Sequence, residues 1–141
     1  MKIKVAATQM SCSWEIEENI SKAINLIHKA AEKGANIILL QELFQTPYFC
    51  IQYDEEIFKL AHTFENNKVL DQMQKIAKDL KVVLPISFFE KDNNAYFNSI
   101  AVINADGNIL GKYRKSHIPD GPGYLEKYYF NPGNTGFKVW D

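Results

Sequence analysis

The order of apolar patterns along the chain predicts an α/β fold, with a layered sheet and helices on its outside. Short strand-like runs first alternate with amphipathic helical segments, and a pair of strands joined by a tight turn follows them. The 141 residues match the common size of one domain and contain no internal repeat, low-complexity tract or linker. We therefore expect a single domain spanning residues 1–141.

The first part of the chain predicts a strand, a helix and a second strand. Apolar positions alternate in residues 3–9, and they recur at helical spacing on one face of residues 16–31. Ser13 is the expected N-cap of this helix, and Gly34 is expected to end it in a left-handed conformation. The continuous apolar run at 36–40 predicts a short strand that is buried on both faces.

The middle of the chain is less regular. Residues 44–64 contain a proline and several aromatic residues, which predicts a long loop with a short helix. A second amphipathic helix is expected over residues 69–80, because its apolar side chains share one face. A further strand is predicted over residues 82–89.

The last part of the chain predicts a β-hairpin and a long loop. Residues 96–103 and 108–114 are expected to be its strands, joined around residues 104–107, where an Asp-Gly pair favours a tight turn. The proline- and glycine-rich residues 116–136 predict a loop, and residues 137–140 a new strand.

Composition narrows the classes of function. Hydrophobic residues make up 46% and charged residues 23% of the chain, which is typical of a folded globular protein. A net charge of -1 gives no electrostatic basis for binding nucleic acid or an anionic membrane. No apolar run approaches the roughly 20 residues of a membrane span, and the N-terminus does not resemble a signal peptide.

The two cysteines, Cys12 and Cys50, have no partners at metal-ligand spacing. A disulfide between them is possible in principle, but a chain with this apolar content does not need one. We interpret both as reduced thiols of a cytoplasmic protein. Cys50 lacks an adjacent base, so we expect a packed thiol rather than a nucleophile.

Three charged residues are candidates for chemistry. Glu42 follows a buried strand, at the position where α/β proteins often place functional groups. Lys115 follows another strand and can present a positive charge to a developing oxyanion. Glu126 lies among aromatic residues in the loop after Lys115. Each also has a simpler interpretation: Glu42 and Lys115 as surface charges, and Glu126 as the partner of Lys127.

Other candidate residues are weaker. Glu42 and Glu126 as a carboxylate pair would suit glycoside hydrolysis, but that chemistry depends on a separation that a sequence does not give. His28 and His62 are expected to have structural or surface roles, and His117 either lines a site or packs within its loop.

Taken together, these segments resemble the nitrilase superfamily of carbon–nitrogen hydrolases. The stretch GANIILLQELFQTPYF is similar to the region of the family's catalytic glutamate, and GNILGKYRKSHIPDGPGYLEKYYFNPGNTGFKVWD to its catalytic-lysine segment. The start, KVAATQMSCSWEIEENISKA, is similar to the family's first strand and helix. The motif IPDGPGY–EKYYFNPG is most similar to the branch of N-carbamoylputrescine amidases.

The resemblance implies an αββα sandwich, of which this chain would be the N-terminal half. It implies that Glu42 is the general base, that Lys115 stabilises the tetrahedral intermediate, and that Glu126 orients the lysine and the substrate nitrogen. The family's nucleophilic cysteine would come shortly after the strand that Phe137 begins, beyond these residues. The implied reaction converts N-carbamoylputrescine to putrescine, carbon dioxide and ammonia, with no metal or organic cofactor. Relatives of this family associate, so a homo-oligomer is expected for the complete protein.

Two hypotheses follow from the resemblance. In the first, the chain is part of a working amidase whose substrate is a small N-carbamoyl amine, with N-carbamoyl-β-alanine as the alternative to N-carbamoylputrescine. In the second, the chain is a non-catalytic scaffold that binds a partner chain. An unpaired half of the family fold would expose strand edges and apolar faces, which predicts association.

Overall fold

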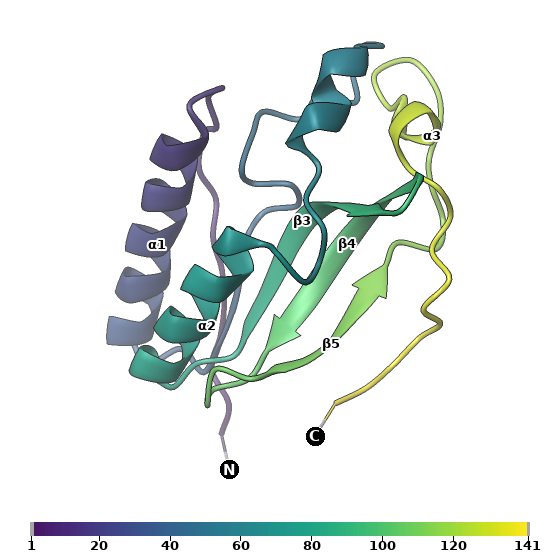
Figure 1. The fold of residues 1–141 in the computed structure, drawn as a ribbon. Coiled ribbons are helices and arrows are strands. Elements are labelled where there is room, and N and C mark those ends of the chain that lie inside the picture. The colour runs from purple at the N-terminus through teal and green to yellow at the C-terminus, as the bar shows by residue number, and fades with distance from the viewer. Residues whose placement is uncertain (1, 141) are drawn as a thin grey trace.

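The computed structural model describes residues 2–140, in which two long helices pack on one face of a β-sheet (Figure 1). The elements, in chain order, are β1 (Val5–Ala7), α1 (Ile16–Glu32), β2 (Ile37–Leu39), the 3-10 helix η1 (Glu55–Leu60), α2 (Lys68–Leu80), β3 (Leu84–Asp92), β4 (Ala95–Ile103), β5 (Ile109–Arg114) and α3 (Glu126–Tyr129). This order confirms the predicted layered α/β class. Among the described residues, no helix is both long and apolar enough to cross a membrane.

The strands form two adjoining parts of one layer. β1 pairs in parallel with β2, and β3, β4 and β5 form an antiparallel sheet in that order. Backbone bonds just before β3 join the two parts: Ile38 N donates to Val83 O at 3.0 Å, and Val83 N donates to Asn36 O at 2.8 Å. The ends of β2 and β5, which precede Glu42 and Lys115, therefore belong to a single rigid layer.

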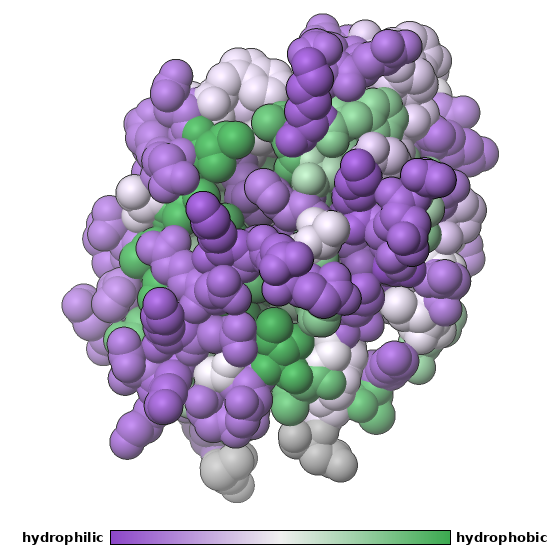
Figure 2. Space-filling model, viewed as in Figure 1, coloured by the Kyte–Doolittle hydropathy of each residue, from purple (hydrophilic) through white to green (hydrophobic). Residues whose placement is uncertain are grey.

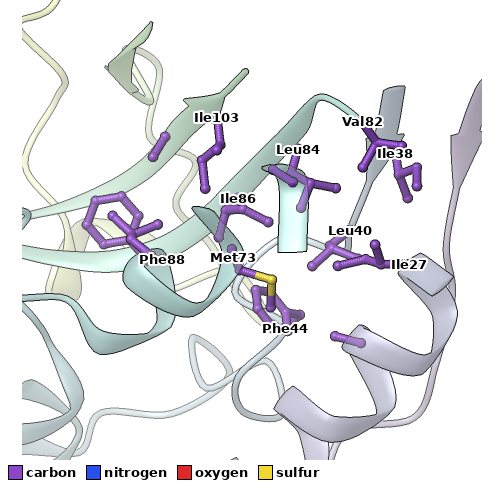
Figure 3. Close-up of a cluster of buried hydrophobic side chains, with 14 of the residues drawn as sticks. Ile27, Ile38, Leu40, Phe44, Met73, Val82, Leu84, Ile86, Phe88 and Ile103 are labelled. Carbon is purple, nitrogen blue, oxygen red and sulfur yellow. The ribbon is translucent and has the colours of Figure 1, made fainter. Parts of the chain in front are cut away.

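The core lies between this layer and the helices α1 and α2 (Figure 3). Ile27 of α1, Met73 of α2, and Ile38, Leu84 and Ile86 of the strands are completely buried there. These side chains come from the helical apolar faces and the strand runs that the sequence predicts. The surface over α1 and α2 is largely hydrophilic (Figure 2), as amphipathic helices require.

The two ends of α1 differ in how well the sequence predicts them. Gly34 takes φ +81°, with bonds from Gly34 N to Ala31 O and from Ala35 N to Ala30 O, which confirms the left-handed stop. The prediction of Ser13 as N-cap is wrong. Glu15 occupies the cap position without a side-chain cap bond, because Asn19 binds both backbone polar groups of Ser13 outside the helix.

Two predictions about strands are also wrong. Ile38 of β2 is fully buried, but Leu39 is 45% exposed, because α1 and α2 cover only one face of the layer. Phe137 and Val139 lie outside any strand and are 81% and 94% exposed. Phe137 packs its ring on Tyr113, but no backbone hydrogen bond joins residues 137–140 to β5 in the described chain. Apolar alternation alone does not make a strand where the backbone has no pairing partner.

Candidate active site

The structure brings the three charged residues singled out in the sequence into direct contact. Lys115 Nζ lies 3.2 Å from Glu42 Oε1 and 2.8 Å from Glu126 Oε2. Glu42 follows β2, Lys115 directly follows β5, and Glu126 is the first residue of α3. Glu126 is thus paired with Lys115, and its expected alternative partner, Lys127, makes no such contact among the ion pairs of residues 2–140.

The backbone beside each of these residues is anchored to the antiparallel sheet. Leu43 adopts φ +52°, an unfavourable value for a leucine, and its N–H donates to Ser87 Oγ of β3 at 2.9 Å. The backbone N–H of Lys115 donates to the carbonyl of Asn98 on β4 at 2.8 Å. The directions in which Glu42 and Lys115 leave the backbone are therefore set by β3 and β4.

Glu126 is a buried glutamate, and each of its carboxylate oxygens has a hydrogen-bond partner. It is only 3% exposed, and while Oε2 contacts Lys115, Oε1 accepts a hydrogen bond of 2.7 Å from the Tyr48 hydroxyl. The start of α3 is attached to the same loop as Tyr48, because Leu125 N donates to Cys50 O at 2.7 Å. Burying the carboxylate without such partners would destabilise the fold by several kcal/mol, because the charge would lose its hydration.

The electrostatic field of the site keeps the lysine charged. Burial lowers the pKa of Lys115, but the bonds from its ammonium to Glu126 and Glu42 outweigh burial and raise the pKa above its ordinary value. Burial also raises the pKa of Tyr48, and the neighbouring Glu126 raises it further, so the phenol stays a hydrogen-bond donor. The site therefore holds a fixed cation between two glutamate side chains.

Cys50 lies in the same environment but is a poor nucleophile. It is fully buried, and burial together with the negative charge of Glu126 raises the pKa of its thiol to about 12. A neutral, inaccessible thiol attacks slowly, because the thiolate is the reactive form. The expectation of a packed thiol is confirmed, and Cys12 is likewise a free thiol.

Glu42 and Lys115 line an open cavity of about 240 Å³. Leu40, Ile100 and Tyr113 contribute much of its apolar wall. The side chain of Glu42 is half exposed and that of Lys115 partly exposed, whereas Glu126 is buried and does not line the cavity. No group of three or more His, Cys, Asp or Glu side chains is arranged to hold a metal ion in the described part of the chain.

Sequence reasoning missed three polar residues of this site: Tyr48, Ser87 and Asn98. Asn98 gives the clearest missed signal, because asparagine is uncommon within strands and this one is 5% exposed in β4. Its side-chain amide donates to Glu42 Oε1. None of the three histidines lines the cavity of Glu42 and Lys115, and His117 is exposed within its loop.

In this α/β layer, a lysine beside a cavity lies between two glutamates. Such a site belongs to the class of proteins that carry out acid–base chemistry next to a fixed positive charge. The chain belongs to the carbon-nitrogen hydrolase family, whose sequence profile matches residues 4–141. It is 55% identical over 139 residues to an N-carbamoylputrescine amidase from Arabidopsis thaliana, covering 99% of this chain and 46% of that relative. A citrullinase from Francisella tularensis is 50% identical over 139 residues, 99% of this chain and 49% of the relative.

The solved structures agree with this family. A carbon-nitrogen hydrolase from Helicobacter pylori G27 superposes with a TM-score of 0.88 at 38% identity, covering 96% of this chain and 46% of that chain. The chain thus spans about half the length of the curated relatives it matches. The expectation of half of the family's αββα sandwich agrees with this coverage.

Proposed function

We propose that this chain carries the base and the charged groups of an enzyme that hydrolyses the carbon–nitrogen bond of an N-carbamoyl amine. The observation that carries the proposal is the contact of Lys115 with both Glu42 and Glu126 at the rim of the cavity. The proposed substrate is N-carbamoylputrescine, giving putrescine, carbon dioxide and ammonia. The names of relatives at 55% and 50% identity support this substrate class.

Each of the three residues has a distinct proposed role. Glu42 is the general base: it accepts the proton of a thiol, returns it to the departing nitrogen, and then takes a proton from the water that hydrolyses the covalent intermediate. Lys115 stabilises the negative charge that develops on the carbamoyl oxygen, an effect of about 3 kcal/mol for one well-placed donor. Glu126 holds Lys115 in place and orients the substrate nitrogen. This mechanism uses no metal or organic cofactor.

The nucleophile in this proposal is a cysteine that is not among these 141 residues. Cys50 is buried with a pKa of about 12, and burial also raises the pKa of Cys12, whose thiol donates to the Phe44 carbonyl. Neither thiol lines the cavity of Glu42 and Lys115. We infer that another part of the whole protein supplies the thiolate, and that the whole protein is a cytoplasmic homo-oligomer, as the family resemblance implies.

A second substrate is favoured by the citrullinase relative. Citrulline and N-carbamoylputrescine share the ureido group and the carbon chain, and differ only in the α-carboxylate of citrulline. The site described here would meet the ureido end that both compounds have in common. N-carbamoyl-β-alanine, with a shorter chain and a terminal carboxylate, remains the alternative that the sequence raised.

The test is ammonia release by the protein as its native source makes it, measured with all three ureido compounds. Wild type should prefer N-carbamoylputrescine. Glu42→Gln and Lys115→Ala should each lower kcat/KM by about 100-fold or more, because base and oxyanion contributions are of that size, with circular dichroism unchanged. Full activity in either variant would refute the assigned role.

The intact mass of the same protein separates the two hypotheses about the chain. A mass above 16.2 kDa, with a thiol reagent modifying a cysteine other than Cys12 or Cys50, supports the catalytic proposal. A mass of 16.2 kDa without turnover favours the non-catalytic scaffold.

A further inference from the structure

We propose that Asn98 is a positioning residue that fixes the carboxylate of Glu42 in one orientation for proton transfer. The inference rests on the proposed function, since it assigns an orienting group to the proposed base. Asn98 Nδ2 donates to Glu42 Oε1, and Lys115 Nζ also contacts this oxygen, at 3.2 Å. Oε2 has no hydrogen-bond partner within residues 2–140, so it is the oxygen left for the reaction.

Asn98 contacts both proposed catalytic groups through different atoms. Its side chain binds Glu42, and its backbone carbonyl accepts the N–H of Lys115 at 2.8 Å. It is paired with Phe89 of β3, and the residue after it, Ser99, begins the pairing of β4 with β5 at Arg114. One buried residue thereby sets the spacing between the base and the cation.

Glu42 benefits from such an anchor because half of its side chain is exposed and it lies in a turn after β2. Holding an exposed glutamate in one rotamer costs side-chain entropy, which a hydrogen bond offsets. Lys115 is a weaker anchor, because its shorter contact is the one to Glu126, at 2.8 Å. A hydrogen bond from a buried neutral amide to a carboxylate is charge-assisted and strong.

The chemistry of the amide suits this task. An asparagine donor cannot give up its proton at neutral pH, so it orients Glu42 without competing for the proton that the base must carry. A lysine or arginine in its place would add a second permanent charge beside Lys115. Asn98 therefore orients Glu42 through a neutral donor, whereas Lys115 brings a positive charge to the same oxygen.

The contact itself is tested without catalysis, by nitrogen-15 NMR of the side-chain amides in this chain. The Asn98 amide resonances should move clearly in Glu42→Gln, and they should exchange slowly with solvent. The amide of Asn19, which is also buried but bonds to Ser13 and Gln45, should not move. An Asn98 amide that is insensitive to Glu42→Gln would overturn the proposal.

The positioning role is tested by kinetics of the protein as its source makes it. Asn98→Asp keeps the shape but replaces the donor with a second carboxylate beside Glu42, and Asn98→Ala removes the group altogether. Both should lower kcat by about 10- to 100-fold, as expected for loss of a hydrogen bond to a charged group, while KM changes by less than about twofold. Asn19→Ala, which removes a buried amide that bonds to Ser13 and Gln45 and not to Glu42, should leave kcat of the folded protein unchanged.

The outcomes separate the two proposals. An unchanged kcat in folded Asn98→Ala, or an equal loss in folded Asn19→Ala, would mean that Asn98 is only structural. If wild type hydrolyses no N-carbamoyl compound, the proposed function fails, while the NMR measurement still decides whether Asn98 holds Glu42.

Discussion

Lys115 shows, at the scale of a single residue, how the fold turns an ordinary surface charge into a fixed one. Its side chain is only 31% exposed, and its ammonium contacts carboxylates from two distant segments. These contacts raise its pKa, so their stabilisation is fully present below the ordinary pKa of 10.5 and is lost as pH rises through the higher folded value. Acidic and neutral conditions therefore leave this cation intact.

Glu90 is a second charged residue on which the site depends, although it does not line the cavity. It is completely buried on β3 and accepts hydrogen bonds from Arg114, Lys112 and Ser99. Arg114, which immediately precedes Lys115, also stacks its guanidinium 3.9 Å from the centre of the Phe97 ring. The end of β5 is thus fixed by an ion pair on its buried side.

The pH dependence of stability should report this ion pair. Burial raises the pKa of Glu90, but the bonds from Arg114, Lys112 and Ser99 outweigh burial and bring it from 4.5 to about 2. The stabilisation is therefore present above pH 4.5 and is lost as pH falls toward 2, and it amounts to about 3 kcal/mol. Glu90→Gln should therefore be less stable than wild type at pH 7 by about the same amount, because Lys112 loses its ion-pair partner and Arg114 keeps only Asp92.

Urea unfolding at pH 7, 4 and 3 measures this effect. The gap between wild type and Glu90→Gln should shrink as pH falls. Glu56→Gln, which removes an exposed partner of Lys59, should behave like wild type at each pH. A gap that stays constant with pH would contradict the assignment to Glu90.

At the scale of elements, the segment 133–135 clamps the end of β5. Gly133 N donates to the Lys115 carbonyl at 2.8 Å, and Arg114 N donates to Thr135 Oγ1 at 3.0 Å. The Arg114 guanidinium also donates to Asn134 Oδ1 at 3.0 Å. The loop after α3 therefore returns to the end of β5 and holds Arg114 and the backbone of Lys115.

Gly133 is required by this close approach rather than by backbone flexibility. A Cβ at this position would lie 2.0 Å from the Arg114 carbonyl oxygen, which is backbone and cannot rotate away. Gly133→Ala should therefore destabilise the chain by about 2 kcal/mol or more and shift the backbone amide of Lys115 in NMR spectra.

Gly123→Ala is the control for Gly133→Ala. Gly123 has φ +82° but no atom within 4 Å of an added Cβ, so only backbone strain of about 1 kcal/mol is expected, with the Lys115 amide unmoved. Equal effects of the two substitutions on Lys115 would argue against the clamp.

At the scale of the whole molecule, the layer has a covered face and an open face. Ala6 and Ile38 are neighbours in the register of β1 and β2 and pack toward the helices. Side chains alternate along a strand, so Val5 and Leu39 point to the other face, where they are 70% and 45% exposed. Exposed apolar surface of this kind usually marks a contact surface.

The 141-residue chain by itself should therefore self-associate. Light scattering after size-exclusion chromatography should give a mass well above 16.2 kDa, and Leu39→Lys should lower it. Ile51→Lys, which changes a 60% exposed residue in the loop before η1, should have little effect. A strictly monomeric wild type would contradict this interpretation of the open face.

Much of the fold followed from local patterns. The helical stripes predicted α1 and α2, Gly34 predicted the end of α1, and the Asp-Gly pair predicted the β4–β5 turn, where Gly107 has φ +87°. These signals are local because helix faces and turn conformations depend on neighbouring residues. The order of the segments also carried the family resemblance that singled out Glu42, Lys115 and Glu126.

The sequence by itself determined the α/β class and the principal elements, because helix and strand periodicity depend on residues that are close along the chain. Its motifs also singled out the three charged residues. Only the tertiary structure decided which groups meet: Lys115 contacts Glu42 across 73 positions, and Tyr48 contacts Glu126 across 78. It also showed that Asn98 binds Glu42 and that residues 137–140 form no strand. Such pairings depend on how distant segments pack, and no local pattern encodes that packing.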